Sequence, residues 1–327
     1  MQATAIDIAM RAISGHLVAR CIQVVAEAGI ADQLGDDPQG AEMLAAPAGV
    51  DADALNRILR LLVAHGVFNA SPEGYRHTDA SRLLRSDHPR SLRAYARMMG
   101  ADWQWRAVGS LGHSLATGET GMRYIFGIES FDYLSAHPAA SAIFDAAMAS
   151  RAALDVESIV EAGAFSRFPV IADIGGGNGS LLRAVLDVAS RSRGILFDLP
   201  HVAGVAPPHE RIEVVSGSFF DDSLPQADAY LLRRILHDWQ DAEARRILTA
   251  IRAAAMPGAR VLIVEAPLPE GNEPHPAKGL DIVMLAVVGG RERTLDEYHS
   301  LLQATGFRWI AATPTPSGTA LIEGEAV

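Results

Sequence analysis

Residues 170–179, with the sequence VIADIGGGNG, decide the fold of this chain. Residues 170–173 have the length and largely apolar composition of a short buried strand, and residues 181–189 have those of a helix. Glycines at such a junction let the backbone turn sharply and approach a ligand closely. The amino end of the following helix favours an electronegative group. The stretch therefore predicts the strand, loop and helix that open a ligand-binding α/β domain.

Strands and helices alternate after this loop. We expect strands at residues 194–198, 212–215, 229–232 and 260–265, and a helix over residues 242–255. This alternation is typical of a parallel, doubly wound sheet. Thr294 and Glu297 form a capping-box pattern that begins another helix, which ends at Gly306. Residues 309–322 are expected to form a terminal hairpin.

The first 95 residues have a different, helical pattern. One apolar stripe at helical spacing contains Ile13, Leu17, Cys21, Val24 and Ala28. Residues 51–65 predict another helix, and residues 67–77 predict a small hairpin. Helices followed by a two-stranded wing are typical of a winged-helix domain. We therefore expect a winged-helix-like domain at residues 1–95, a helical linker at 96–165 and a Rossmann-like α/β domain at 166–327.

Composition restricts the classes of partner. The chain has 327 residues and a formal net charge of -11, so it gains nothing from counterion release on a phosphate backbone, and nucleic acid is not expected as a partner. Cys21 is the single cysteine, which excludes an intrachain disulfide and a multi-cysteine zinc site. Arg11, Arg20 and Glu27 interrupt the apolar amino-terminal run, so we expect neither a signal peptide nor a membrane span. These features favour a cytoplasmic protein.

The glycine loop could serve several nucleotide-like ligands. A dinucleotide fingerprint counted from Gly175 requires glycine or alanine at position 180, where this chain has Ser180, and this disfavours a nicotinamide dehydrogenase. Asp198 stands at the end of the next expected strand, 19 residues after Gly179. A carboxylate in that place can accept hydrogen bonds from both hydroxyls of a ribose. A tight structural turn beside a surface aspartate is the alternative.

Four motifs then occur in order: residues 173–179 (DIGGGNG), 197–202 (FDLPHV), 236–239 (LHDW) and 289–294 (GGRERT). They resemble the ordered motifs of the caffeate-type, class I S-adenosylmethionine-dependent O-methyltransferases, a family with plant phenylpropanoid and bacterial antibiotic-tailoring members. The resemblance spans essentially the whole chain. It implies S-adenosylmethionine as the methyl donor, no metal, and a homodimer held by the winged-helix-like domain. We accordingly expect residues 59–68 to form dimer core rather than to contact DNA.

The resemblance also assigns donor contacts. It implies that Gly175 and Gly177 lie against the methionine end, that Asp198 holds the ribose, and that Phe219 lies near the adenine. Arg233 stands where the family often has a lysine or another polar contact. One position departs from the family: an aspartate usually precedes the residue at 219, and this chain has Ser218. An uncharged serine weakens adenine recognition unless Asp221 or Asp222 substitutes.

Methyl transfer from a sulfonium is an in-line displacement, so the enzyme must align its two substrates and supply a deprotonated oxygen. A phenol titrates near pH 10, so a nearby base helps at neutral pH. His237, after the strand at 229–232, is the candidate base, and the resemblance assigns Glu265 and Glu292 as its carboxylate partners.

Simpler interpretations exist for these three residues. His237 could cap the helix that follows it, and Glu265 could be a surface acid at the end of a strand. Glu292 could pair with the neighbouring Arg291 or Arg293.

The acceptor pocket is expected between the helical linker and the sheet. Its candidate lining residues are Met148, Trp239, Met284 and Val287, each of which could equally be plain core. The sequence thus predicts O-methylation of a small aromatic or polyketide-like metabolite. Alternatives are a relative that hydroxylates or decarboxylates its substrate, and a winged-helix regulator that senses a ligand. An acidic chain disfavours the regulator.

Overall fold

The computed structural model describes residues 4–327. The chain forms two compact units, and the predicted division at residues 95 and 165 stays a prediction. One unit contains the residues up to Trp105 together with Leu134–Ala153, and the other contains Arg106–Tyr133 and Leu154–Val327. Helix α11 (Pro138–Ala162) contributes residues to both units.

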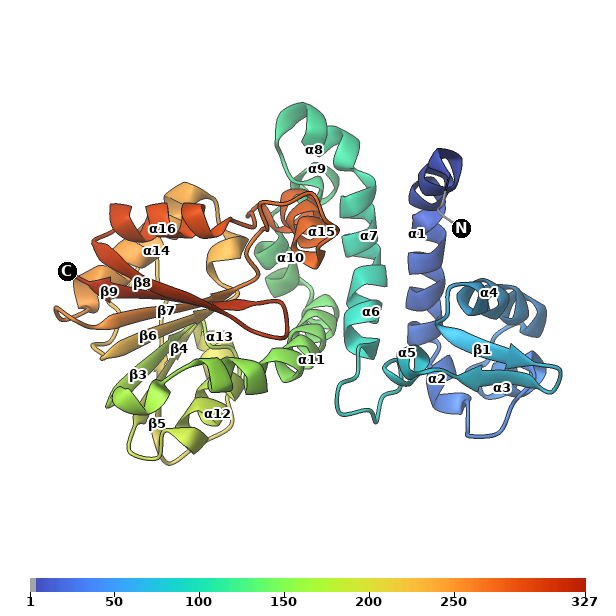
Figure 1. The fold of residues 1–327 in the computed structure, drawn as a ribbon, viewed down its shortest axis with the longest axis horizontal. Helices are drawn as coiled ribbons and strands as arrows, with labels where there is room; N and C mark the ends of the chain where they lie inside the picture. The colour runs from blue at the N-terminus through green and yellow to red at the C-terminus, as the bar shows by residue number, and fades with distance from the viewer. Residues whose placement is uncertain (1–3) are drawn as a thin grey trace. The chain divides into compact units, whose positions relative to one another are not determined.

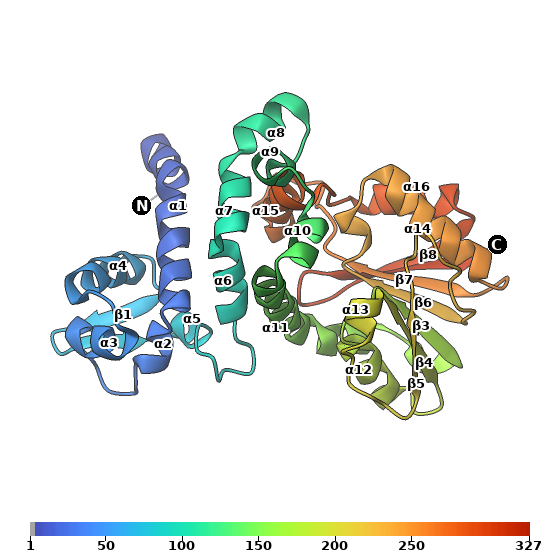
Figure 2. The same ribbon diagram turned by 180° about the vertical axis from the view of Figure 1, so that it is seen from behind.

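The first unit contains helices packed around a small hairpin, as predicted (Figure 2). Its elements are α1 (Ala5–Glu27), α2 (Ile30–Gln33), α3 (Ala41–Ala48), α4 (Ala52–Ala64), β1 (Phe68–Ser71), β2 (Gly74–His77), α5 (Asp79–Arg82) and α6 (Arg93–Gly100). Helix α4 begins where the Asp51 side chain accepts a hydrogen bond from the Ala54 N–H. Strands β1 and β2 pair antiparallel and form the expected wing.

The expectation that residues 59–68 form dimer core stays a prediction, and three residues of this segment are buried within their own chain. Leu59, Leu62 and Phe68 are at most 1% exposed within a single chain, where they pack with Val25 and Ile30. Helical spacing marks these positions as apolar and facing inward, but it does not show whether the covering surface comes from the same chain. These three residues therefore belong to the core of the unit itself.

The amino-terminal part of helix α1 carries apolar residues that lie outside that core. Ile13 and Leu17, from the predicted stripe, are 70% and 51% exposed, and Ile6 and Met10 are also exposed. Among the described residues, α1 is the one helix long and apolar enough by composition to cross a membrane, which is weak evidence for a membrane span. Only 11% of the most apolar 18-residue stretch of α1 is buried.

The second unit is built on a seven-stranded sheet (Figure 1). Its strands are β3 (Val170–Ile174), β4 (Arg193–Asp198), β5 (Ile212–Ser216), β6 (Ala229–Arg233), β7 (Arg260–Glu265), β8 (Phe307–Pro314) and β9 (Ala320–Ala326). The order is β5-β4-β3-β6-β7-β9-β8. The first five strands are parallel, and the terminal hairpin adds two antiparallel strands to one edge. This confirms the predicted α/β fold, with a mixed sheet.

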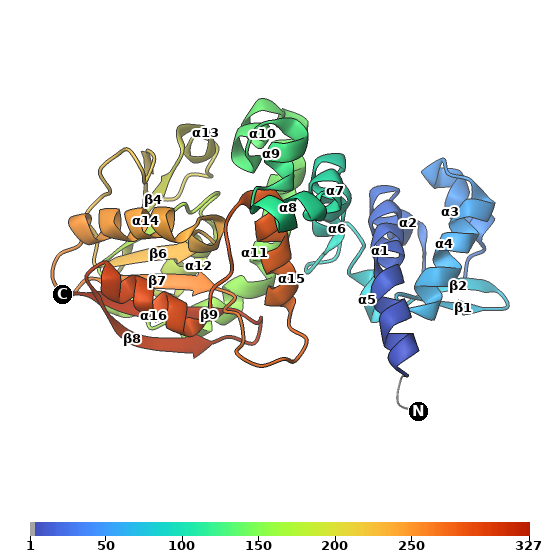
Figure 3. The same ribbon diagram turned by 90° about the horizontal axis from the view of Figure 1, so that it is seen from above.

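Helices cover both faces of this sheet (Figures 1 and 3). The helices of this unit are α7 (Asp102–Gly109), α8 (Leu111–Thr117), α9 (Gly121–Phe126), α10 (Ser130–Ala136), η1 (Phe165–Arg167), α12 (Ser180–Val188), α13 (Pro200–Ala203), η2 (Leu236–Asp238), α14 (Asp241–Ala254), α15 (Pro276–Val283), the π-helix η3 (Met284–Val288) and α16 (Leu295–Ala304), with α7 and α10 each divided between the units. Helices α14 and α16 pack on Tyr230 and Ile263, and α12 packs on Ile171 and Leu231 of the opposite face. Alternate residues of each parallel strand thus enter separate cores.

The winding of the sheet places the site. From β3 the chain winds outward through β4 and β5, then crosses back to β6 on the other side of β3. This reversal between β3 and β6 is the switch point at which open α/β sheets bind ligands, beyond the carboxyl ends of the strands. The glycine loop after β3, Asp198 at the end of β4, and Glu265 at the end of β7 all lie at that edge.

Candidate active site

The glycine loop leaves room for a ligand beside β3. Gly175 and Gly177 have positive φ angles of 68° and 60°, which side chains rarely adopt. A Cβ at Gly176 would lie 2.4 Å from Leu196 and 2.7 Å from the Asp173 carboxyl, so the loop is closed on that side. A Cβ at Gly177 would meet nothing within 4 Å. The loop is therefore open at Gly177, where the resemblance expects the donor.

Two aspartates frame this loop. Asp198 accepts hydrogen bonds from the Gly177 N–H at 2.8 Å and the Leu199 N–H at 2.7 Å, which fixes its carboxylate beside the glycines. Burial raises the pKa of Asp198, and the two N–H donors oppose that rise. Asp173 is 2% exposed, and its Oδ2 has no hydrogen-bond partner in the described part of the chain. Burial raises the pKa of Asp173 to about 7, against the positive charge of Arg233. A buried, unsatisfied carboxyl oxygen at the base of the loop fits a ligand that donates a hydrogen bond.

Ser218 is held by the two aspartates that follow it. Its hydroxyl donates to Asp221 Oδ2 at 3.0 Å, and its N–H donates to Asp222 Oδ2 at 2.8 Å. Phe219 packs edge-on against Phe220 and against Trp239, with ring centroids 4.8 and 6.0 Å apart. Acidic groups therefore surround Ser218, although the residue itself is neutral.

Arg233 ends strand β6, Arg234 follows it, and the two side chains share one buried partner. Arg233 Nη1 lies 3.3 Å from Asp155 Oδ1, and Arg234 Nη2 lies 3.4 Å from Asp155 Oδ2. Arg234 has a φ of 53°, a left-handed conformation that costs a non-glycine residue of the order of 1 kcal/mol. This turn directs the chain away from the sheet and into the segment that carries His237.

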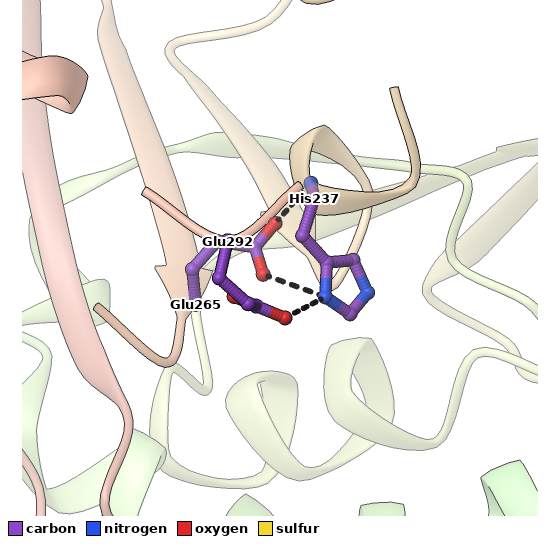
Figure 4. A group of neighbouring side chains, drawn as sticks. All are labelled: His237, Glu265 and Glu292. Atoms are coloured by element: carbon purple, nitrogen blue, oxygen red, sulfur yellow. Dashed lines mark hydrogen bonds and ion pairs between the residues drawn. The ribbon is translucent and has the colours of Figure 1, made fainter. Parts of the chain in front are cut away.

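The imidazole of His237 lies against two buried carboxylates (Figure 4). His237 Nδ1 is 2.7 Å from Glu292 Oε1 and 3.8 Å from Glu265 Oε2. Glu265 Oε1 accepts hydrogen bonds from the N–H groups of Leu236 and His237, at 3.0 and 3.3 Å. Glu292 thus holds the ring, and Glu265 holds the backbone of the loop. His237, Glu265 and Glu292 are 6%, 0% and 1% exposed.

This geometry contradicts the simpler interpretations of the three residues. Helix α14 has Gln240 at its N-cap with no side-chain cap, so His237 does not cap it. Glu265 is fully buried, so it is not a surface acid. Glu292 bonds to His237, whereas Arg291 and Arg293 pair with Glu297 and Asp241 instead.

The charges in this group are strongly coupled. Burial alone would lower the pKa of His237, but the charges of Glu265 and Asp238 and the hydrogen bond that the ring donates to Glu292 together raise it to about 9. Burial raises the pKa of Glu265 to about 7 and that of Asp238 to about 6. His237 is therefore mainly an imidazolium at neutral pH in the free protein.

Sequence reasoning missed Asp238 and Arg293 as parts of this site. Asp238 Oδ1 lies 3.4 Å from His237 Nε2, the nitrogen that does not contact Glu292. Arg293 is 0% exposed and donates to the carbonyls of Leu236 and Trp239. Both residues lie inside the quoted motifs, so the motifs mark their importance, but only the folded chain shows their partners.

The second unit brings three of the four acceptor candidates to one region. Phe131 stacks on Trp239 at 6.2 Å between ring centroids, and the neighbouring Ser130 donates to the Val287 carbonyl. Val287 and Met284, both on η3, are 2% and 5% exposed, so in the free protein they are largely core. Met148, on α11, belongs to the other unit and is half-buried there.

A glycine loop at the switch point and a buried histidine–carboxylate pair at the same edge define the class of protein: a Rossmann-like enzyme with a helical, winged amino-terminal unit. Residues 109–308 match the model of the O-methyltransferase domain, and residues 10–87 match that of the O-methyltransferase dimerisation domain. The chain belongs to this O-methyltransferase family.

Individual relatives agree with this assignment along nearly the whole chain. The phenazine O-methyltransferase of Lysobacter antibioticus is 39% identical, over 98% of this chain and 96% of the relative. The 3-amino-4-hydroxybenzoate 4-O-methyltransferase of Streptomyces cremeus is 35% identical, over 95% and 87%. The crystal structure of human N-acetylserotonin methyltransferase in complex with S-adenosylmethionine superposes with a TM-score of 0.92 at 27% identity, over 99% and 98%.

The family confirms the main sequence predictions. The chain is an S-adenosylmethionine-dependent O-methyltransferase of small metabolites, typical of secondary metabolism. Its dimerisation domain supports a homodimer. His237, Glu265 and Glu292 also offer ligand atoms within 4.8 Å of one another, a spacing that could hold a metal ion. The 2.7 Å contact from Nδ1 to Oε1 has the length of a direct hydrogen bond instead, and the family requires no metal.

Proposed function

We propose that this enzyme methylates a phenolic hydroxyl of a small, planar aromatic metabolite, with His237 as the general base. The observation that carries the proposal is the 2.7 Å contact between His237 Nδ1 and Glu292 Oε1. In the neutral form of the imidazole, a carboxylate on Nδ1 keeps that nitrogen protonated and leaves Nε2 as the basic atom. Nε2 then accepts the proton of the acceptor hydroxyl, and Asp238 and Glu265 stabilise the imidazolium that forms.

We assign the donor contacts to the edge of the sheet described above. S-adenosylmethionine supplies an activated methyl group on a sulfonium. Gly175 and Gly177 form the cradle for its methionine end. Asp198 accepts hydrogen bonds from the ribose hydroxyls, and Phe219 packs beside the adenine. Ser218 contributes a neutral contact, with the charge supplied by Asp221 and Asp222 next to it. Arg233, held by Asp155, supplies a polar contact.

The raised pKa of His237 suits a phenol. A phenol titrates near pH 10 and His237 near 9, so proton transfer between them costs only about 1.4 kcal/mol. An unperturbed histidine, near 6.5, would leave a gap of about 3.5 pKa units, roughly 5 kcal/mol. The buried carboxylates thus make His237 a stronger base, although it is mostly protonated at neutral pH before the acceptor binds.

We infer an aromatic acceptor from the walls of the site. Trp239 and Phe131 present stacked rings in the same unit as His237. Met284 and Val287, both buried in the same unit, are the proposed apolar support, and Met148 is the proposed contribution from the helical linker. The relatives from Lysobacter antibioticus and Streptomyces cremeus are named for aromatic substrates, which supports a similar class here.

We further propose that the homodimer works in the cytoplasm, with no nucleic-acid or membrane partner. The formal net charge of -11 opposes binding to phosphate backbones and anionic lipids. The exposed apolar residues of α1 fall largely inside the match to the dimerisation domain, residues 10–87, which supports a second copy as their cover.

The test compares the wild type with His237→Ala and, as a control, with His65→Ala, which changes an exposed histidine of the first unit. We expect His237→Ala to lower kcat at least about 100-fold, the usual contribution of a general base. The affinity for S-adenosylhomocysteine, measured by calorimetry, should change little. Phenols, benzoic acids and aromatic amines serve as acceptors. Wild-type turnover of phenols by His237→Ala would overturn the proposed role of His237, and turnover of benzoic acids alone would overturn the acceptor class.

A further inference from the structure

Two segments that are far apart in the sequence run side by side at the active site. Residues 236–240 carry His237, and residues 289–293 carry Glu292. The Arg291 N–H donates to the His237 carbonyl at 2.8 Å, and the Gln240 amide donates to the Gly289 carbonyl at 2.6 Å. A Cβ at Gly290 would lie 2.0 Å from the His237 carbonyl oxygen. We call these two segments the seam.

The buried side chain of Arg293 joins the two segments of the seam by hydrogen bonds. It has the largest fully buried side chain of the described residues, at 0% exposure. Its Nη1 donates to the Leu236 carbonyl at 2.7 Å, and its Nη2 donates to the Trp239 carbonyl at 2.8 Å. Nε and Nη2 also donate to Asp241 Oδ1, at 3.0 and 2.9 Å. The guanidinium therefore holds the loop at the residue before His237 and at the second residue after it.

The same residue also limits the movement of Glu292. Arg293 follows Glu292 directly, and the N–H of Glu292 itself donates to Asp281 Oδ1 at 2.9 Å. The backbone of Glu292 is thus held on both sides. Since the bond from Nδ1 to Oε1 joins the two segments, its length depends on how firmly they are held together. A displacement of about 1 Å in a catalytic group can lower the rate about 100-fold.

We propose that Arg293 is a positioning residue that fixes the imidazole of His237 against Glu292, without touching either substrate. Its complete burial removes it from contact with a bound molecule. Five N–H donors in a rigid, planar fork let one side chain reach two carbonyls and a carboxylate at once. A lysine keeps the charge beside Asp241, but its single ammonium lacks that planar geometry. The inference rests on the proposed role of His237 as the base only for its effect on turnover.

The experiment compares Arg293→Lys with Arg291→Lys. Arg291 lies in the same segment and pairs with Glu297 at 2.9 Å, but its side chain is 41% exposed and it donates to neither loop carbonyl. Each purified homodimer is first checked by thermal unfolding and by calorimetric titration with S-adenosylhomocysteine. Proton NMR of samples with labelled histidine then records the Nδ1–H resonance of His237, which His237→Gln identifies by its loss. Steady-state kinetics with a phenolic acceptor give kcat and KM separately.

We expect Arg293→Lys to shift or broaden the His237 Nδ1–H resonance and to lower kcat about 10- to 100-fold. KM and the affinity for S-adenosylhomocysteine should stay within about twofold of wild type, because uniform binding is retained. Arg291→Lys should match wild type in every readout. An Arg293→Lys enzyme with the wild-type resonance and kcat would overturn the proposal. So would a matching loss in Arg291→Lys.

A second variant applies if Arg293→Lys does not fold. Asp241→Asn removes the charged partner that anchors the guanidinium, and its side chain is 50% exposed, so folding should tolerate the change. We expect a smaller shift of the same resonance and a several-fold fall in kcat. An unchanged resonance in a folded Asp241→Asn enzyme would overturn the proposal. The resonance is measured without an acceptor, so it does not depend on catalysis. If His237→Ala kept wild-type turnover, the proposed base would be lost, but the result on the position of the imidazole would still stand.

Discussion

Replacement of Glu292 by glutamine should change the pH at which the enzyme becomes active. Glu292 Oε1 lies 2.7 Å from His237 Nδ1, and the pKa of His237 is raised to about 9. The reactive form is the neutral imidazole, so kcat/KM should rise with pH through the pKa of His237 in the free enzyme. Glu292 favours the charged form. Its removal must therefore lower that pKa and move the rising limb to lower pH.

The size of this shift follows from the contact. A hydrogen bond to a charged group contributes about 1.5–3 kcal/mol, and about 1.4 kcal/mol corresponds to one pKa unit. The limb should therefore move down by about one to two pH units in Glu292→Gln. The amide oxygen of glutamine still accepts a hydrogen bond from Nδ1, so the ring keeps an anchor. At pH 7 the lower pKa leaves a larger fraction of His237 neutral, which partly offsets the weaker base.

The assay measures kcat/KM from pH 6 to 10 with a phenolic acceptor, for wild type, Glu292→Gln and the exposed control Glu270→Gln. Titration of the phenol itself is the same in all three enzymes, so the difference between the curves belongs to the protein. Glu270→Gln should reproduce the wild-type limb. An unmoved limb in Glu292→Gln, with affinity for S-adenosylhomocysteine intact, would refute the idea that this carboxylate sets the basicity of His237.

Three further perturbations have defined outcomes. Because burial raises the pKa of Asp173 to about 7, its ionisation lowers the free energy of unfolding as the pH rises from about 4 to above 7. Asp173→Asn should therefore raise the free energy of unfolding by up to about 4 kcal/mol at pH 8 and leave it unchanged at pH 4. The same variant should weaken S-adenosylmethionine binding in calorimetry. Gly290→Ala should destabilise the chain by about 1–3 kcal/mol in urea unfolding and lower kcat, because its Cβ would meet the His237 carbonyl, whereas Gly271→Ala, in open space, should do neither. EDTA treatment should leave turnover unchanged if the close contact of His237 with Glu292 is a hydrogen bond, and a loss restored by a divalent cation would show a metal site instead.

The local parts of the fold were predictable because their signals are local. The strand from Val170, the helix after Asp51 and the capping box at Thr294 depend on residues within a few positions of one another, and the structure confirms each of them. The terminal hairpin also formed as predicted. In contrast, spacing gave no way to decide which surface covers an apolar stripe. Leu59 accordingly proved to be core of its own chain, and Ile13 proved to be exposed.

At the site, too, the residues with local signals were predictable and their long-range partners were not. His237 could be singled out from its motif, but its contact with Glu292 spans 55 positions of sequence and was available only through a family resemblance. Asp238 and Arg293 were visible as letters of the same motifs without a role. Their roles depend on their contacts, of Arg293 with the Leu236 carbonyl and of Asp238 with the His237 ring. These contacts form only when residues 236–240 and 289–293 lie side by side.

The arrangement of charge also argues for the kind of acceptor. Glu265, Glu292 and Asp238 place three carboxyl groups around one imidazole, and none of them is more than 20% exposed. A benzoate at the reacting position would bring a further carboxylate into this acidic group, where Coulomb repulsion is weakly screened. A phenol arrives neutral and becomes negative only as its proton moves to His237, so the pair gains an imidazolium in the same step. The proposed phenolic acceptor fits this arrangement, because a phenol is neutral when it binds and needs a base when it reacts, whereas a carboxylic acid is already ionised.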